Sequence, residues 1–169
     1  VPDVLKTAMT LDYPLISASA DRMKLVTDIL GDKIKPRIGI SWRGGRNLAA
    51  KIRSMSLGEL LNGLPDEIDI DVVSLQYTEG HEEEVVAHGD RRVAHSGLNN
   101  RHDFDGVLAL ISQCDAVITV DNAVAHFAAI SGCPTLVLIP AAQTQFRWKN
   151  EDLRTTFFPS AEIFSQVVP

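Results

Sequence analysis

Four short apolar runs, separated by segments with helical spacing, constrain the fold of this chain more than any other feature. The runs are rich in β-branched residues and lack polar alternation, which is typical of strands covered on both faces. They are RIGISW at 37–42, IDVVSL at 70–75, AVITV at 116–120 and TLVLI at 135–139. The helical segments are SLGELLNGL at 56–64, FDGVLALISQC at 104–114 and NAVAHFAAIS at 122–131. This alternation predicts an α/β fold, a Rossmann-like parallel sheet with helices on both faces.

The region before the first strand is predicted to be a linker followed by a short helix. DRMKLVTDILG at 21–31 has the spacing of an amphipathic helix, whereas residues 1–20 show no sustained period and suit a linker or an arm lying on another domain. We therefore divide the chain into a linker and connecting helix at 1–35 and one Rossmann-like domain at 36–169. The sequence begins VPDVLKTAM, without an initiator Met or the features of a signal peptide, so we expect part of a longer protein.

Charge and composition exclude several classes of partner. The 169 residues carry 16 Lys and Arg against 22 Asp and Glu, a net charge of −6, so we expect no long-range attraction to nucleic acid or to an acidic membrane. No apolar stretch approaches the roughly 18–20 residues that span a bilayer, so we expect a soluble, cytoplasmic protein without a membrane span. Cys114 and Cys133 form no CxxC pair and are expected to be buried free thiols.

Parallel sheets of this type bind ligands beyond the carboxyl ends of their strands, which directs attention to the loops at 43–55, 76–81 and 121–123. In the first loop, Gly44 and Gly45 let a ligand approach the backbone closely, and guanidinium groups match the oxygens of a phosphate or diphosphate. The cations of this loop are Arg43, Arg46, Lys51 and Arg53. The loop matches neither the P-loop nor the GxGxxG pattern, and a solvated basic loop would have the same composition.

The loop at 121–123 adds a second polar site at the same edge. Asp121 follows a predicted strand and is expected to cap the next helix, on which Asn122 and His126, four residues apart, share one face. The positive end of this helix favours an anion. A simple N-cap accounts for Asp121 alone, and a hydrogen-bonded core histidine accounts for His126 alone. Neither accounts for two polar sites, distant in sequence, that reach one edge of the sheet.

For other polar and aromatic residues, the sequence gives weaker indications of a role in ligand binding. Three residues after the second predicted strand could lie beside a nucleoside: Gln76, Tyr77 and Glu79. Trp42 and Trp148 are expected to pack near the crevice, with base stacking as the alternative.

Four histidines recur every seven residues, at 81, 88, 95 and 102, which suggests a heptad or a metal site. Glycines at 80, 89 and 97 interrupt any continuous helix, so we interpret the spacing as a coincidence. The segment EGHEEEVVAHGD is interpreted as a solvated acidic helix. No metal and no other cofactor is expected.

The segment VITVDNAVAHFAAISGCPTLVLIP resembles the strand, acidic turn, helix and Gly-x-Pro strand in the C-terminal domain of bacterial heptosyltransferase-like glycosyltransferases. Their pattern is roughly D-[ST]-x-x-x-H-x-A-x-A-x-G-x-P. IGISWRGG, RSMSLGEL, VVSLQY and FRWKN…FFPSAEIFSQ resemble still more closely a bacterial group in which this domain follows tetratricopeptide repeats. The matches span 37–166 in the same order. They imply one half of a GT-B enzyme, in which two Rossmann-like domains face a cleft and the C-terminal one holds a nucleotide-diphosphate sugar.

The resemblance also implies roles for individual residues of the acidic turn. Asp121 matches the family acid that meets the donor sugar or orders the loop at the diphosphate. Asn122, Ala123 and Val124 stand where backbone N–H groups face that diphosphate. His126 matches the helix histidine beside them.

In the basic loop, Arg53 falls where the family places a phosphate-binding Lys or Arg, with Lys51 as a nearby substitute. The sequence departs from the family pattern at Asn122, which replaces Ser or Thr, and at Ile130 and Ser131, which replace Ala-Leu. The first departure could alter the diphosphate contacts, and the second repacks the core.

We therefore expect the donor-binding domain of a glycosyltransferase, whose general base lies in an N-terminal half that is absent here. Such a chain would bind a nucleotide diphosphate without transferring sugar by itself. Its expected partners are a nucleotide-diphosphate sugar and the N-terminal half or repeat domain of the same protein. Two alternatives remain, a non-catalytic Rossmann-like interaction module and half of a nucleotide-sugar epimerase.

Overall fold

The computed structural model of this chain describes residues 12–45, 48–65, 68–89, 93–141, 148, 155 and 157–166. Its strands are β1 (Arg37–Ser41), β2 (Asp71–Ser74), β3 (Val93–Ala94), β4 (Ala116–Val120), β5 (Thr135–Ile139) and β6 (Ala161–Ser165). Its helices are α2 (Ala20–Leu30), α3 (Leu48–Ile52), α4 (Leu57–Asn62), α5 (His81–His88), α6 (Phe104–Ser112) and α7 (Ala123–Ile130). Every strand and helix predicted from the sequence is present, close to its predicted bounds.

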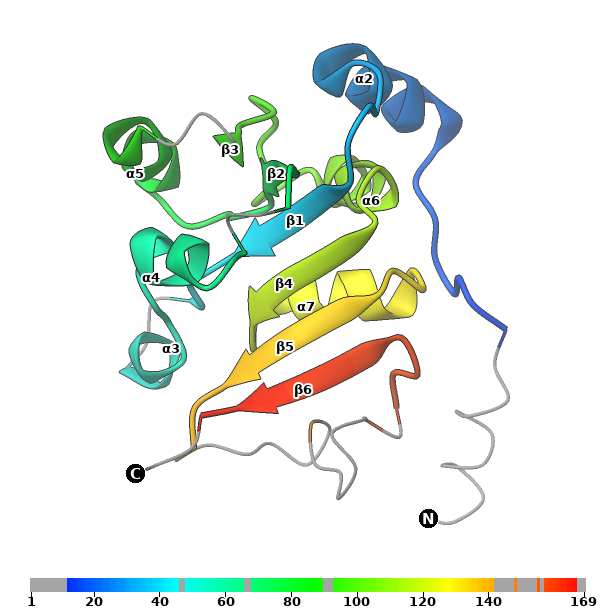
Figure 1. The fold of residues 1–169 in the computed structure, drawn as a ribbon. Helices are drawn as coiled ribbons and strands as arrows, with labels where there is room; N and C mark the ends of the chain where they lie inside the picture. Colours follow the sequence, from blue (N-terminus) through cyan, green and yellow to red (C-terminus); the bar gives the residue numbers. More distant parts are fainter. Residues whose placement is uncertain are drawn as a thin grey trace.

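The strands form one parallel sheet in the order β3-β2-β1-β4-β5-β6, which Figure 1 shows from β3 at the top to β6 at the bottom. In the centre of the sheet, Gly39 of β1 lies opposite Val73 of β2 and Val117 of β4. The strand order reverses between β1 and β4, and such a switch point is where open α/β sheets bind ligands. The predicted Rossmann-like fold is therefore confirmed.

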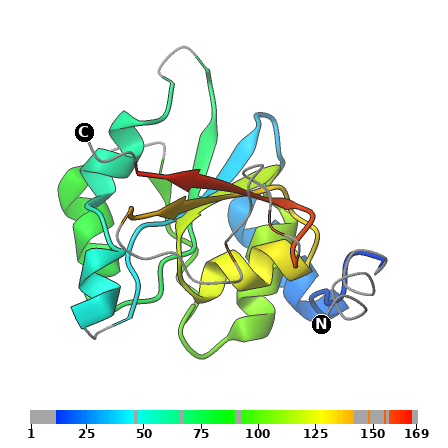
Figure 2. The same ribbon diagram turned by 90° about the horizontal axis from the view of Figure 1, so that it is seen from below.

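Helices cover both faces of the sheet, and each face has its own apolar cluster. On one face, α4 and α5 pack over Ile40 and Val72. On the other, α2, α6 and α7 pack over Val73 and Val117. Figure 2 shows the two groups of helices on opposite sides of the sheet. Since both faces are covered, the strands carry continuous apolar runs in place of polar alternation.

Gly39 of β1 lies closely against the side chains of Leu75 and Cys114. A Cβ atom at this position would lie 2.6 Å from Leu75 Cδ1 and 3.1 Å from Cys114 Sγ. Because real Cβ atoms do not approach other heavy atoms so closely, only glycine fits here without a shift of the neighbouring core.

The helix before the sheet, α2, belongs to the packed structure. Val26 is fully buried in the cluster with α6, and the Ser19 N–H and hydroxyl donate to Asp105 at 2.9 and 2.6 Å. The segment before α2 also contacts the domain, because Leu15 N donates to Ile130 O at 2.8 Å. The described residues of the predicted linker therefore lie on this domain.

Two further expectations concern the core and the membrane. Cys114 and Cys133 are buried and free, as predicted. Within the described ranges, no helix combines the length and the apolar character that crossing a membrane requires.

Candidate functional site

The carboxyl ends of β1, β2 and β4 bring together the three loops selected from the sequence. Gln76, after β2, and Asn122, after β4, both bond to the backbone of Arg43 after β1. The candidate site is thus built at the switch point of the sheet, and its loops are tied to one another by side-chain amides.

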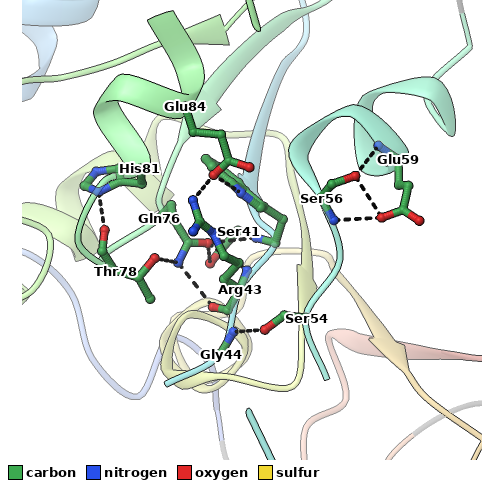
Figure 3. A network of polar contacts seen from close by, with 11 residues as sticks. Ser41, Arg43, Gly44, Ser54, Ser56, Glu59, Gln76, Thr78, His81 and Glu84 are labelled. Carbon is green, nitrogen blue, oxygen red and sulfur yellow. Dashed lines mark hydrogen bonds and ion pairs between the residues drawn. The ribbon is translucent and has the colours of Figure 1, made fainter. Parts of the chain in front are cut away.

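Gln76 is fully buried and forms several hydrogen bonds to the loop after β1 (Figure 3). Its Oε1 accepts from Trp42 N at 2.8 Å, Arg43 N at 2.9 Å and the Ser41 hydroxyl at 3.0 Å. Its Nε2 donates to Arg43 O at 3.2 Å and to the Thr78 hydroxyl at 3.1 Å. All these hydrogen bonds of the Gln76 amide are made within the protein. Gln76 would therefore influence a ligand by positioning this loop.

Asn122 caps α7 and joins it to β1. Its Oδ1 accepts from Val124 N at 2.9 Å and Ala125 N at 3.4 Å, which is the N-cap arrangement. Its Nδ2 donates to the Ser41 hydroxyl at 2.8 Å and to Arg43 O at 3.1 Å. Two N–H groups at the start of α7 are thus satisfied by the protein itself.

The prediction that Asp121 caps the following helix is wrong, because Asn122 occupies the N-cap position. Asp121 is 2% exposed and turns its carboxylate toward two other partners. Its Oδ2 accepts from Arg53 Nη1 at 2.8 Å, and its Oδ1 accepts from Trp148 Nε1 at 2.8 Å. The Arg53 guanidinium also donates to Asp121 O at 3.2 Å. Charge pairing and two hydrogen-bonded oxygens offset the cost of burying this carboxylate.

Arg53 is the predicted cation that the structure brings against the acidic turn. Its side chain is 16% exposed and is held in place by Asp121. Lys51, at the end of α3, is exposed to solvent. Arg46 lies outside the described residues.

Arg43 is directed toward α5, where its Nη2 forms an ion pair with Glu84. The same carboxylate accepts from Trp42 Nε1 at 2.9 Å, and Trp42 itself is fully buried. Glu84 therefore neutralises one cation of the loop and anchors it to α5, as Figure 3 shows.

The two glycines of the loop differ in their surroundings. Gly44 is buried, its N–H donates to the Ser54 hydroxyl at 3.0 Å, and an added Cβ would lie 3.3 Å from that of Ala50. Gly45 is exposed, and an added Cβ would meet nothing within 4 Å. Gly44 thus permits tight packing of the loop on α3, while Gly45 leaves the backbone open beside a cavity.

That cavity, of about 460 Å³, lies between the loops after β2 and the start of α7. Its walls are mainly apolar and include Phe104, Val107 and Phe127. Asn100 also lines it and is buried; its Nδ2 donates to Gln76 O at 3.1 Å, but its Oδ1 has no hydrogen-bond partner among the described residues. This volume is in the range of pockets that bury a small organic ligand.

Tyr77 connects the cavity to the charged pair. It lines the cavity together with Ala123 at the start of α7, and Arg53 and Asp121 both lie close enough to act on it electrostatically. Burial raises the pKa of Tyr77, while the nearby Ala123 backbone and the Arg53 charge act in the opposite direction. The phenol therefore stays protonated at neutral pH.

His126 belongs to an aromatic cluster at the edge of the site. Its ring stacks on Trp148, with centroids 5.0 Å apart and an interplanar angle of 25°, and meets Phe158 edge-on at 5.5 Å. Since Trp148 also holds Asp121, a continuous chain of contacts runs from His126 to Arg53. The expectation that both tryptophans pack near the crevice is confirmed.

Several residues of this site were not selected from the sequence: Asn100, Phe104, Val107 and Phe127. Asn100 lies in a turn before α6, where no sequence pattern marks it. Phe104 and Phe127 lie on helices, where apolar residues are expected for packing alone. Only the packing of α6 beside α7 places them around one cavity.

Comparison with known proteins supports the fold. No family model matches this sequence, and no curated protein matches it. The chain is similar to a solved structure of E. coli ADP-heptose LPS heptosyltransferase II, with 19% sequence identity and a TM-score of 0.62. The match covers 94% of this chain and 48% of that one, so the chain spans about half the length of its structural neighbour. The chain therefore has the Rossmann-like α/β fold of about half of that heptosyltransferase.

Proposed function

We propose that this chain is the donor-binding half of a GT-B glycosyltransferase and binds the nucleoside diphosphate of a nucleotide sugar. One observation carries the proposal. Arg53, whose side chain is 16% exposed, is fixed by Asp121 at the sheet switch point and lies near Tyr77, which together with the start of α7 lines a cavity of about 460 Å³. The fold shared with a heptosyltransferase supports it.

The diphosphate would lie between Arg53, Gly45 and the N-terminus of α7. A guanidinium fork and a helix N-terminus both favour phosphate oxygens. Tyr77 and Ala123 both line the cavity, so a phosphate oxygen that accepts from the Ala123 N–H would need room beside the Tyr77 ring. Rotation of Tyr77 would then accompany binding.

The nucleoside would occupy the cavity beside the diphosphate. Its apolar wall, including Phe104 and Phe127, suits the faces of a base. The Oδ1 of Asn100, buried without a hydrogen-bond partner in the described part of the chain, would accept from an amino group. A base that carries an exocyclic amine is therefore favoured over one that does not.

The chemical contribution of this half would be electrostatic. As the bond between sugar and diphosphate breaks, negative charge grows on the diphosphate, and Arg53 together with the α7 N-terminus would stabilise that charge. The general base and the acceptor site would come from the remainder of the protein, so the chain alone would bind without transferring sugar.

Isothermal titration calorimetry with ADP, UDP and GDP tests this proposal. We expect saturable binding of at least one nucleotide, and Arg53→Ala to weaken it at least tenfold, because a charge-assisted bond to phosphate is worth about 1.5–3 kcal/mol. The control is Lys35→Ala, which removes an equal charge from an exposed pair with Asp69. It should bind as the wild type does.

The rival function, a non-catalytic interaction module, makes the opposite prediction. No saturable binding of any of the three nucleotides would overturn the proposal. Equal affinity of Arg53→Ala and the wild type would also contradict it. The variant Asp121→Ala also distinguishes the two functions. An interaction module predicts only lower stability for this variant, because such a module has no nucleotide affinity to lose. Product analysis of the full-length protein distinguishes a transferase from an epimerase.

A further inference from the structure

A second cluster, independent of the proposed function, lies where α5 meets the loop after β3. It consists of His81 and Glu82 at the start of α5 and His95 beyond β3. One ligand atom from each of the three side chains lies within 4.8 Å of the others. His88 and His102, which share the seven-residue spacing, are exposed and stand outside the cluster. The fold has therefore brought together two histidines that no helix periodicity would pair.

His81 presents a buried lone pair. The residue is 9% exposed, and its Nδ1 lies 2.6 Å from Thr78 O, as Figure 3 shows. Because a carbonyl oxygen only accepts, Nδ1 must carry the proton, which leaves Nε2 unprotonated in the neutral ring. Nε2 is buried and has no hydrogen-bond partner among the described residues. A histidine whose other nitrogen donates to a backbone carbonyl is the usual form of a metal-ligating histidine.

His95, which faces His81 across the cluster, also has buried ring nitrogens without hydrogen bonds in the described part of the chain. Both of its ring nitrogens are buried, and neither has a hydrogen bond of acceptable geometry within the described residues. Its Nε2 lies 3.0 Å from Glu82 Oε1, and its ring meets that of His81 edge-on with centroids 5.4 Å apart. An ion pair with a protonated His95 would account for the Glu82 contact, but it would leave His81 Nε2 unsatisfied.

We propose that His81, His95 and Glu82 form a binding site for a divalent transition metal of the Zn²⁺ type. Two imidazoles and one carboxylate are a common zinc ligand set, with water in the fourth position. Tetrahedral ligands at zinc lie about 3.4 Å apart, so the ligand atoms, now within 4.8 Å of one another, must approach by up to about 1.4 Å. Glu82 is 57% exposed and can move toward the two rings. The metal would satisfy the buried nitrogens and clip α5 to the loop after β3.

The local charges are compatible with a cation. The N-terminus of α5 repels it, but three glutamates, at 82, 83 and 84, occupy the first turn of that helix. Among the described residues, the guanidinium of Arg43 acts on His81 by its charge, and it is paired with Glu84. The carboxylate of Glu82 therefore remains available to the metal.

Titration of the chelator-treated protein with Zn²⁺ alone tests this site, with no nucleotide present. We expect one Zn²⁺ per chain by calorimetry, a higher Tm, and visible d–d bands of a four-coordinate ion when Co²⁺ replaces Zn²⁺. Glu82→Gln and His95→Gln should each weaken binding at least tenfold. His81→Asn should do the same while keeping a donor for Thr78 O, since the Asn amide nitrogen matches the position of Nδ1.

The matched controls are Glu83→Gln, the adjacent carboxylate outside the cluster, and His88→Gln, the exposed histidine at the other end of α5. Both should bind Zn²⁺ within twofold of the wild type. No stoichiometric Zn²⁺ binding by the wild type would overturn the proposal. Undiminished binding by Glu82→Gln would do so too, and because Glu82 is exposed this variant should keep its fold, which circular dichroism can verify.

Discussion

At the scale of single residues, buried amides shape the candidate site as much as cations do. Gln76 and Asn122 together bond to the backbone or side chain of each residue from Ser41 to Arg43. Their oxygens and nitrogens satisfy groups that would otherwise be buried without partners. The loop that carries the predicted cations is therefore held by neutral side chains from the two neighbouring strand ends.

Replacement of Gln76 by methionine should destabilise the protein strongly. The change keeps the volume but leaves the Ser41 hydroxyl and the N–H groups of Trp42 and Arg43 without their acceptor. At about 1–3 kcal/mol for each unsatisfied buried group, with partial relaxation, we expect a loss of about 3 kcal/mol in the free energy of unfolding. Urea denaturation measures it. Gln166→Met, at an exposed position, is the control, and equal stability of the two variants would contradict the assigned role.

At the scale of elements, α7 is positioned by its cap. A helix of eight residues gains little from intrinsic propensity, so its stability depends on its cap and its packing. Asn122 supplies the cap and also the bonds that hold α7 against β1. A serine, which the resemblance leads one to expect here, could supply the cap but could not reach across to β1.

Two substitutions at this position separate the two roles. Asn122→Ala should cost about 2–3 kcal/mol, because it removes the cap and the bonds to Ser41 and Arg43. Asn122→Ser should cost about 1 kcal/mol less, since a serine hydroxyl can still accept from the helix N–H groups. Chemical denaturation of both variants gives the difference. Equal stability of the two would mean that the cap contributes nothing measurable.

At the scale of the whole molecule, the sheet and the layer of α2, α6 and α7 bury both thiols. Burial raises the pKa of Cys114 to about 12 and that of Cys133 to about 11. Both lie where α6 and α7 return to the sheet, within the cluster that includes Val26 of α2. Cys114 and Cys133 are only 8% and 9% exposed, at the wall of a cavity beside Met23, so both thiols are shielded in the folded chain.

Thiol reactivity should accordingly report unfolding of the whole domain. At pH 8 the native protein should react negligibly with Ellman's reagent, because thiolate is scarce and the sulfurs are buried. In urea, two thiols should react, with a transition that coincides with loss of circular dichroism. Fast reaction of the native chain would show that the layer of α2, α6 and α7 opens locally.

The sequence predicts those strands and helices whose apolar residues form a clear local pattern. The strands β1, β2, β4 and β5 are β-branched runs buried on both faces, so their pattern is strong. β3 has two residues and β6 is an edge strand with exposed side chains, so neither carries such a pattern. Both become strands because the neighbouring β2 and β5 offer them backbone partners.

The sequence by itself determined the fold class, the main elements and the edge of the sheet where the polar loops meet, because side-chain direction repeats along a helix or strand. Only the tertiary structure decided the individual contacts. It made Asn122 the cap and turned Asp121 to Arg53, it enclosed Gln76, and it placed His81 beside His95. Such contacts depend on strand order, on register and on competition among neighbouring polar groups for the same partners. Those are properties of the packed molecule, and no local sequence pattern contains them.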